Sequence, residues 1–176
     1  MTIEGQNMDQ AAPGELVNEP TEEQKREVLE KRLHAAAFAE IVSVLMRSPA
    51  HNQMPLRNLE GHVVPPFLTK QFSIARAKSK EGHFPIFPVG VALWASVSDE
   101  IDKRLSENPD APVQLKPNEW KSGDNIWVID IVARPEVGTK ILDDLKKSAF
   151  KGKQFKMRVA GTDGTRKIET MSGEAA

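Results

Sequence analysis

The sequence predicts an α+β domain in which a mixed, mostly antiparallel sheet is flanked by helices. Three observations support this fold class: an amphipathic run over residues 21–47, two strand-like runs at 72–75 and 89–97, and an apolar run at 126–132 that precedes a second amphipathic run. Helical and strand periods therefore alternate along the chain. The length of 176 residues fits one domain better than two.

The composition excludes several classes of protein and site. The chain is 39% hydrophobic and 28% charged with a formal net charge of −1, so no global field indicates a nucleic-acid or membrane partner. The absence of cysteine excludes a disulfide scaffold, a thiol nucleophile and a thiolate metal site. Without a long apolar run or a signal-like N-terminus, we expect a cytoplasmic protein with no transmembrane helix.

The two ends of the chain differ in charge. Residues 1–20 are rich in Gln, Asn, Glu, Gly and Pro, which predicts a disordered acidic tail before a domain at 21–172. Residues 1–30 carry eight acids and two bases, whereas nine bases and five acids follow from residue 140 onward. The basic end is either a solvated face or a docking surface for an acidic macromolecule.

The first amphipathic run predicts one long helix. Thr21 can cap its N-terminus, and the helix is expected to end near Arg47 because Pro49 disfavours a helical Ser48. His51 then lies just beyond the helix. The apolar stripe comprises Val28, Leu29, Leu33, Ala36, Ala37, Ile41, Val44 and Leu45.

The middle of the chain predicts a hairpin. Residues 56–71 are a short helix or an irregular segment, which Pro65 and Pro66 are expected to break. The runs at 72–75 and 89–97 predict two strands that are joined through a polar turn containing Gly82.

The second half predicts the rest of the sheet. Residues 99–111 are a charged helix or turn with poor capping, and 126–132 is a candidate central strand. Residues 136–150 form an amphipathic helix with Ile141, Leu142 and Leu145 inward. A last strand, a turn and a short strand or frayed end follow.

Asp130 interrupts the apolar run WVIDIVA, where a buried carboxylate is costly without a partner. It can face water, it can cap a turn or pair with a lysine, or it can pair with a histidine. A carboxylate beside an imidazole holds one tautomer and stabilises the imidazolium. The candidates are His34, His51, His62 and His83, and spacing does not choose among them, although His34 is expected to face water.

Other sites receive little support. No His-x-x-x-His pair or calcium-type loop predicts a metal, and Gly161-Thr-Asp-Gly164 lacks the lysine and spacing of a phosphate loop. No serine-hydrolase elbow occurs. Trp94, Trp120 and Trp127 are predicted core or rim aromatics, one of which can line an apolar channel.

Four segments occur in an order that indicates a function. They are SPAH at 48–51, HVVPPF at 62–67, PVGVALWASVS at 88–98 and WKSGDNIWVID at 120–130. Over about residues 38–160 the chain resembles the RTX toxin-activating lysine acyltransferases, the HlyC-like proteins. Two segments depart from that family: SVLM stands where it has Trp-Leu-Trp, and IVARPEVG where it has Trp-Ile-Ala-Pro-Phe-Gly. These departures allow a different acyl pocket or acceptor groove.

The resemblance implies a Gcn5-type N-acetyltransferase fold and a specific reaction. Such enzymes transfer a fatty acyl group from acyl carrier protein to internal lysines of an RTX-type protoxin, with the acylated carrier protein as donor and no tightly bound cofactor. The site residues carried over are His51 and Asp130, with His51 as the general base or, alternatively, as a transiently acylated nucleophile. A homodimer is one alternative for the oligomeric state.

Two other functions stay open at this level. One is an N-acyltransferase for a small amine, and the other is a non-catalytic module that binds an RTX protein. The presence of both His51 and Asp130 argues against the second. Because acyl carrier protein is acidic, the basic C-terminal part is expected to bind it.

Overall fold

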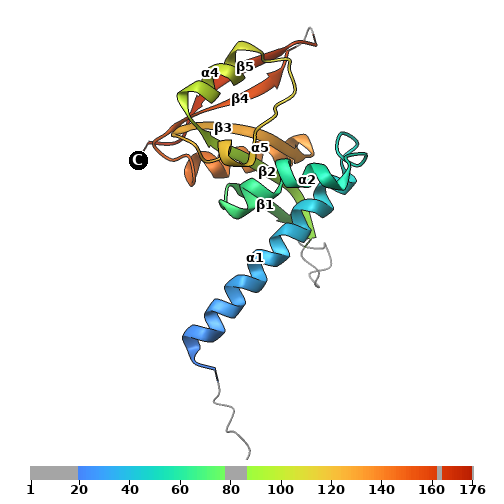
Figure 1. Cartoon of the computed structure of the whole chain (residues 1–176), viewed down its shortest axis with the longest axis vertical. Coiled ribbons are helices and arrows are strands. Elements are labelled where there is room, and N and C mark those ends of the chain that lie inside the picture. The colour runs from blue at the N-terminus through green and yellow to red at the C-terminus, as the bar shows by residue number, and fades with distance from the viewer. Residues whose placement is uncertain (1–19, 78–86, 162–163, 176) are drawn as a thin grey trace, which may run out of the picture. The chain divides into compact units, whose positions relative to one another are not determined.

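A computed structural model describes residues 20–77, 87–161 and 164–175 (Figure 1). The chain divides into two compact units, Met1–Leu33 and His34–Ala176. The helical elements are α1 (Glu22–Arg47), η1 (Leu56–Asn58), α2 (Leu59–His62), α3 (Val64–Leu68), α4 (Asp99–Glu107), η2 (Pro117–Glu119) and α5 (Pro135–Lys147). The strands are β1 (Phe72–Ala77), β2 (Phe87–Val97), β3 (Asn125–Ala133), β4 (Gln154–Ala160) and β5 (Arg166–Ser172).

The five strands form one mixed sheet in chain order, from β1 to β5. Neighbouring strands are antiparallel except β3 and β4, which are parallel. The predicted α+β class, the mostly antiparallel sheet and the central position of the 126–132 run are therefore confirmed. The predicted Gly82 turn and His83 lie outside the described residues, as do residues 1–19 of the predicted tail at 1–20.

Two apolar clusters cover the two faces of the sheet. One joins residues of α1, α4 and the segment around Val63 to Val91, Leu93 and Trp127. The other joins α5, through Ile141 and Leu145, to the opposite face of β2, β3 and β4. Trp120 and Trp127 are almost fully buried, as core aromatics should be. None of the helices in the described ranges carries an apolar stretch of membrane-spanning length.

Helix α1 begins and ends where the sequence indicates. The backbone N–H of Gln24 donates to Thr21 Oγ1, and the backbone N–H of Thr21 donates to Gln24 Oε1, which is a reciprocal cap. Only the C-terminal part of the predicted stripe is buried, because Val28, Leu29 and Leu33 are 48%, 56% and 61% exposed. The buried members are Ala37, Ile41, Val44 and Leu45.

Pro65 and Pro66 divide the segment as expected: α2 ends at His62 and α3 begins at Val64, with both prolines in its first turn, where N–H groups need no helical acceptor. Two other expectations were wrong. The helix α4 is capped by Ser98, whose hydroxyl accepts from the N–H of Ile101, so its capping is not poor. The ring of His34 does not simply face water, because one side of it stacks on Phe67 with centroids 4.1 Å apart.

The Ser-Gly-Asp turn before β3 packs closely on the end of β2. A Cβ atom at Gly123 would lie 2.6 Å from the carbonyl oxygen of Val97 and 2.7 Å from the Cα atom of Ser98. We therefore expect Gly123→Ala to destabilise the fold by roughly 1–3 kcal/mol, the usual cost of overpacking. Chemical denaturation of both variants measures this, with Gly61→Ala as control because nothing lies within 4 Å of that Cβ. Equal stabilities would contradict the close packing.

Candidate active site

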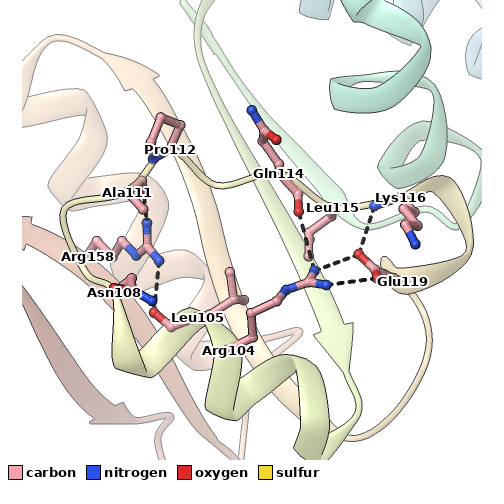
Figure 2. A pocket seen from close by; sticks show the side chains of 10 residues that line it. All are labelled: Arg104, Leu105, Asn108, Ala111, Pro112, Gln114, Leu115, Lys116, Glu119 and Arg158. Atoms are coloured by element: carbon pink, nitrogen blue, oxygen red, sulfur yellow. Dashed lines mark hydrogen bonds and ion pairs between the residues drawn. The ribbon is translucent and has the colours of Figure 1, made fainter.

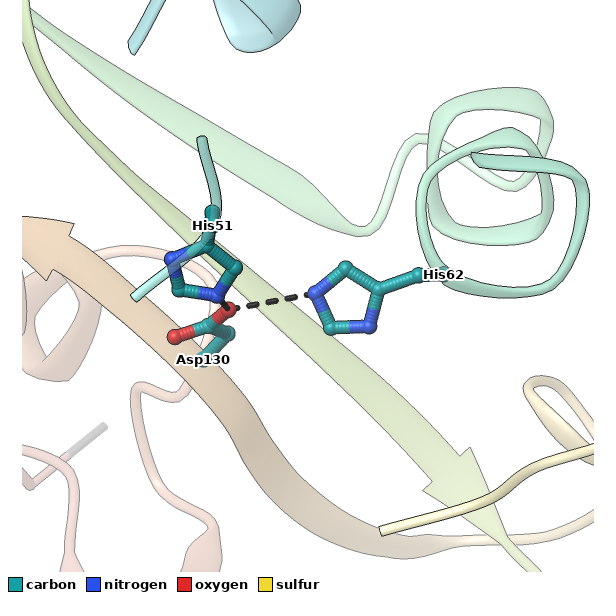
Figure 3. Close-up of side chains that lie close together, drawn as sticks. All are labelled: His51, His62 and Asp130. Carbon is teal, nitrogen blue, oxygen red and sulfur yellow. Dashed lines mark hydrogen bonds and ion pairs between the residues drawn. The ribbon is translucent and has the colours of Figure 1, made fainter. Parts of the chain in front are cut away.

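Asp130 is the centre of a cluster of ionisable side chains on the α1-covered face of the sheet. Its Oδ2 atom lies 2.9 Å from Nε2 of His51 and 3.1 Å from Nε2 of His62 (Figure 3). The side chains of Asp130, His51 and His62 are 18%, 19% and 25% exposed. Asp130 therefore pairs with histidines, and it neither faces water nor pairs with a lysine in the described structure.

The turn after α1 positions His51. The carbonyl oxygen of Ser48 accepts from the N–H groups of His51 and Asn52, and the carbonyl oxygen of His51 accepts from Met54. Pro49 ends the helix, so the chain folds into this tight turn directly over β3. The local sequence thus places His51 without help from a distant loop.

His62 is the last residue of the short helix α2. The indole N–H of Trp120 donates to the carbonyl oxygen of the preceding residue, Gly61, at 3.1 Å. The rings of His62 and Trp120 meet edge to face with centroids 6.4 Å apart. Trp120, the first residue of the WKSGDNIWVID segment, therefore fixes the histidine that faces the last residue of that segment, Asp130.

The site holds a buried negative charge. Burial raises the pKa of Asp130, but the hydrogen bonds from His51 and His62 outweigh it and lower that pKa to about 2. The hydrogen bond to Asp130 raises the pKa of His51 above its ordinary 6.5, against the effect of burial. Asp130 is thus ionised at neutral pH.

The proton positions follow from this ionisation. An ionised carboxylate only accepts hydrogen bonds, so both Nε2 atoms must carry a proton. In its neutral form, each imidazole then has its lone pair on Nδ1. At His51 this Nδ1 lies 3.0 Å from the hydroxyl oxygen of Ser48, which donates to it. A hydroxyl, an imidazole and a carboxylate are therefore aligned, an arrangement that can accept a proton at Nδ1.

Sequence reasoning named two of the three residues in the cluster. His51 and Asp130 lie together, whereas His34 packs elsewhere on Phe67. His62 is one of the four candidate histidines, but spacing does not select it, because 68 residues separate it from Asp130. Its position at the start of HVVPPF, one of the four segments, was the available signal.

A pocket away from this cluster offers less chemistry. It has a volume of about 560 Å³ and is lined by α4, the segment after it and β4 (Figure 2). Arg104 forms an ion pair with Glu119 at 2.7 Å, and Arg158 donates to the carbonyl oxygens of Leu105 and Ala111. Its charged groups thus mainly hold the surrounding chain together.

Comparisons with known proteins match most of the chain. The model of the RTX toxin acyltransferase family matches residues 30–172. An uncharacterized protein of Synechocystis sp. is 28% identical over 127 residues, which cover 72% of this chain and 81% of that protein. The protein-lysine palmitoyltransferase CyaC of Bordetella bronchiseptica is 31% identical over 98 residues, which cover 56% of this chain and 48% of that protein. The lysine-acyltransferase RtxC of Vibrio cholerae is 24% identical over 111 residues, which cover 62% of this chain and 66% of that protein. The chain thus spans about half the length of the Bordetella enzyme.

The paired charges predict a pH-dependent stability. Asp130, with a pKa of about 2 instead of 3.8, stabilises the fold above pH 3.8, and this contribution is lost as the pH falls toward 2. The raised pKa of His51 adds stability that is complete below pH 6.5 and is lost as the pH rises through its folded value. Asp130→Asn should therefore melt at a lower temperature than the wild type, and this deficit in melting temperature should be largest between pH 3.8 and 6.5.

Thermal melts of both proteins from acid to alkaline pH measure this deficit. Asp144→Asn, at an exposed residue of α5, serves as the matched control and should follow the wild type. A deficit for Asp130→Asn that stays constant with pH would contradict the paired charges.

Proposed function

The chain belongs to the RTX toxin acyltransferase family, and on that premise we propose that it transfers a fatty acyl group from acyl carrier protein to internal lysines of an RTX-type protoxin. The acyltransferase domain comprises residues 21–172. One observation carries the proposal: the pairing of His51 with Asp130 leaves Nδ1 of His51 as the nitrogen that accepts a proton.

In this proposal His51 is the general base. A lysine side chain has a pKa near 10.4 and is mostly protonated at neutral pH, so its nitrogen must lose a proton to attack. Only the neutral amine attacks; as its N–C bond to the thioester carbonyl forms, Nδ1 of His51 takes a proton from the attacking nitrogen and Asp130 offsets the charge of the imidazolium. When the C–S bond breaks, the imidazolium returns the proton to the leaving sulfur.

Ser48 and His62 support this chemistry. The hydroxyl of Ser48 occupies Nδ1 of His51 in the resting site and must turn away when the amine arrives. His62 is a positioning residue. Asp130 accepts a second hydrogen bond from His62, and this bond keeps Asp130 ionised and fixed while His51 changes charge. The two rings are nearly parallel, at 24°, with centroids 6.0 Å apart.

A hollow beside Ser48 suits the donor better than the acceptor. It has a volume of about 330 Å³ and an apolar wall that includes Phe87 and Val132. The charged residues that line it are Arg47 and Arg134, without a carboxylate. Two guanidinium groups repel a lysine and attract an anionic donor, so we place the phosphate-bearing arm of the carrier protein here.

The basic residues after 140 supply the second contact with the carrier protein. Lys146 is 3.4 Å from Asp143 and Lys147 is 4.0 Å from Glu174, so part of their charge is compensated. Lys140, Lys151 and Lys153 are exposed and have no ion-pair partner in the described ranges. This face of α5 and the turn after it can steer an acidic protein.

We expect His51→Ala to abolish acyl transfer to an RTX protoxin fragment, measured by intact mass with octanoyl acyl carrier protein as donor. Asp130→Asn should lower the rate by on the order of 10²-fold or more, the scale of general acid–base contributions. Its rate should recover poorly at higher pH, because orientation and charge support are lost. His34→Gln is the matched control and should be unaffected, since His34 packs on Phe67.

Retained activity in His51→Ala would refute this role for His51. An acyl mass on the enzyme itself, absent in His51→Ala, would instead identify His51 as the nucleophile. Acylation of a small amine but of no protoxin lysine would change the acceptor class.

Binding of the carrier protein should weaken as salt rises, because exposed charges are screened. Lys146→Glu combined with Lys147→Glu should slow association, measured by stopped-flow fluorescence, more than it lowers the melting temperature. If this double variant associates normally and Arg134→Glu does not, docking lies at the hollow alone.

A further inference from the structure

The three side chains of the site are also a set of metal-binding donors. One donor atom each from His51, His62 and Asp130 lies within 4.8 Å of the other two. Zinc sites commonly combine imidazole nitrogens and carboxylate oxygens, with three protein ligands and one open position. The donors come from a turn, a helix end and a strand, so no local spacing such as His-x-x-x-His announces them.

The distances require little movement to admit an ion. Donor atoms about 2.0–2.2 Å from a tetrahedral zinc ion lie roughly 3.3–3.6 Å from one another. The two nitrogen–oxygen distances are 2.9 and 3.1 Å, so each must lengthen by a few tenths of an ångström, and the third pair of donors lies within 4.8 Å. Each side chain is about one-fifth exposed, which leaves a path for the ion and a place for water as the fourth ligand.

Ser48 supplies the support that a metal-bound imidazole needs. When an ion occupies Nε2 of His51, the neutral ring must carry its proton on Nδ1. That N–H then faces the hydroxyl oxygen of Ser48 at 3.0 Å, which can accept it. Such partners fix the tautomer and orientation of a ligating histidine.

We propose that His51, His62 and Asp130 bind a divalent transition-metal ion of the zinc class, and that the bound ion inhibits acyl transfer. Two imidazoles and one carboxylate favour this class over Mg²⁺ or Ca²⁺, which require more oxygen ligands. The ion takes both Nε2 atoms, and the proton on Nδ1 of His51 leaves no lone pair to accept one from lysine. The inhibition rests on the proposed function, whereas the binding does not.

Isothermal titration of the metal-free full chain with ZnCl₂ tests the binding. We expect one ion per chain. Ser48→Ala removes a partner of a ligating histidine and should lower the affinity by roughly 10–100-fold. His62→Gln removes a ligand itself and should lower the affinity by more than that. His34→Gln should bind as the wild type does, because His34 lies on Phe67. Equal affinities of His62→Gln and the wild type would overturn the site.

Acyl transfer with and without ZnCl₂ tests the inhibition. Inhibition that follows the binding curve and is reversed by a chelator supports the proposal, whereas unchanged or increased activity with zinc bound overturns it. A metal-free chain that transfers no acyl group would refute the proposed function but leave the titration result valid. Circular dichroism of His62→Gln checks folding, and Ser48→Ala provides an independent readout if that variant unfolds.

Discussion

The buried charge of Asp130 is the constraint on which the site depends. A carboxylate inside an apolar strand costs several kcal/mol unless charged or polar groups compensate it. Here the compensation comes from two imidazoles, His51 and His62, in segments that are distant from β3 in sequence. The end of α1 and the end of α2 therefore have to lie over the same strand position, so one side chain ties the helical layer to the sheet.

The sheet prepares this position through its pairing. Asp130 lies opposite Leu93 on β2, and the register shifts between Leu93 and Trp94. On the other side, the parallel pairing of β3 with β4 extends only to Val128. Asp130 therefore lies just beyond the last β3 residue that pairs with β4. At this position β3 still pairs with β2, but its other edge has no neighbouring strand in the part of the chain that the structure describes. A shift by one residue would turn the carboxylate into the α5 face.

The parts of the site that local rules control were predictable. Pro49 ends α1 and so places His51, and the apolar run around Asp130 marks the central strand. His62 was not predictable by such rules, because its contact with Asp130 depends on tertiary packing between Gly61 and Trp120. Likewise, the periodicity of Val28, Leu29 and Leu33 predicts an apolar face but not whether that face is covered, and these residues are exposed.

The location of one proton links the acid–base and metal chemistry of the cluster. With protons on both Nε2 atoms, Asp130 is satisfied and Nδ1 of His51 can act as a base. In the proposed metal-bound state the ion takes those same atoms, the proton moves to Nδ1 and the proposed base is lost. Both proposed states use the same backbone and the same Ser48 hydroxyl, which donates to Nδ1 in the first state and accepts from it in the second. In this proposal His62 does more than reinforce His51, because it supplies the third donor for the ion.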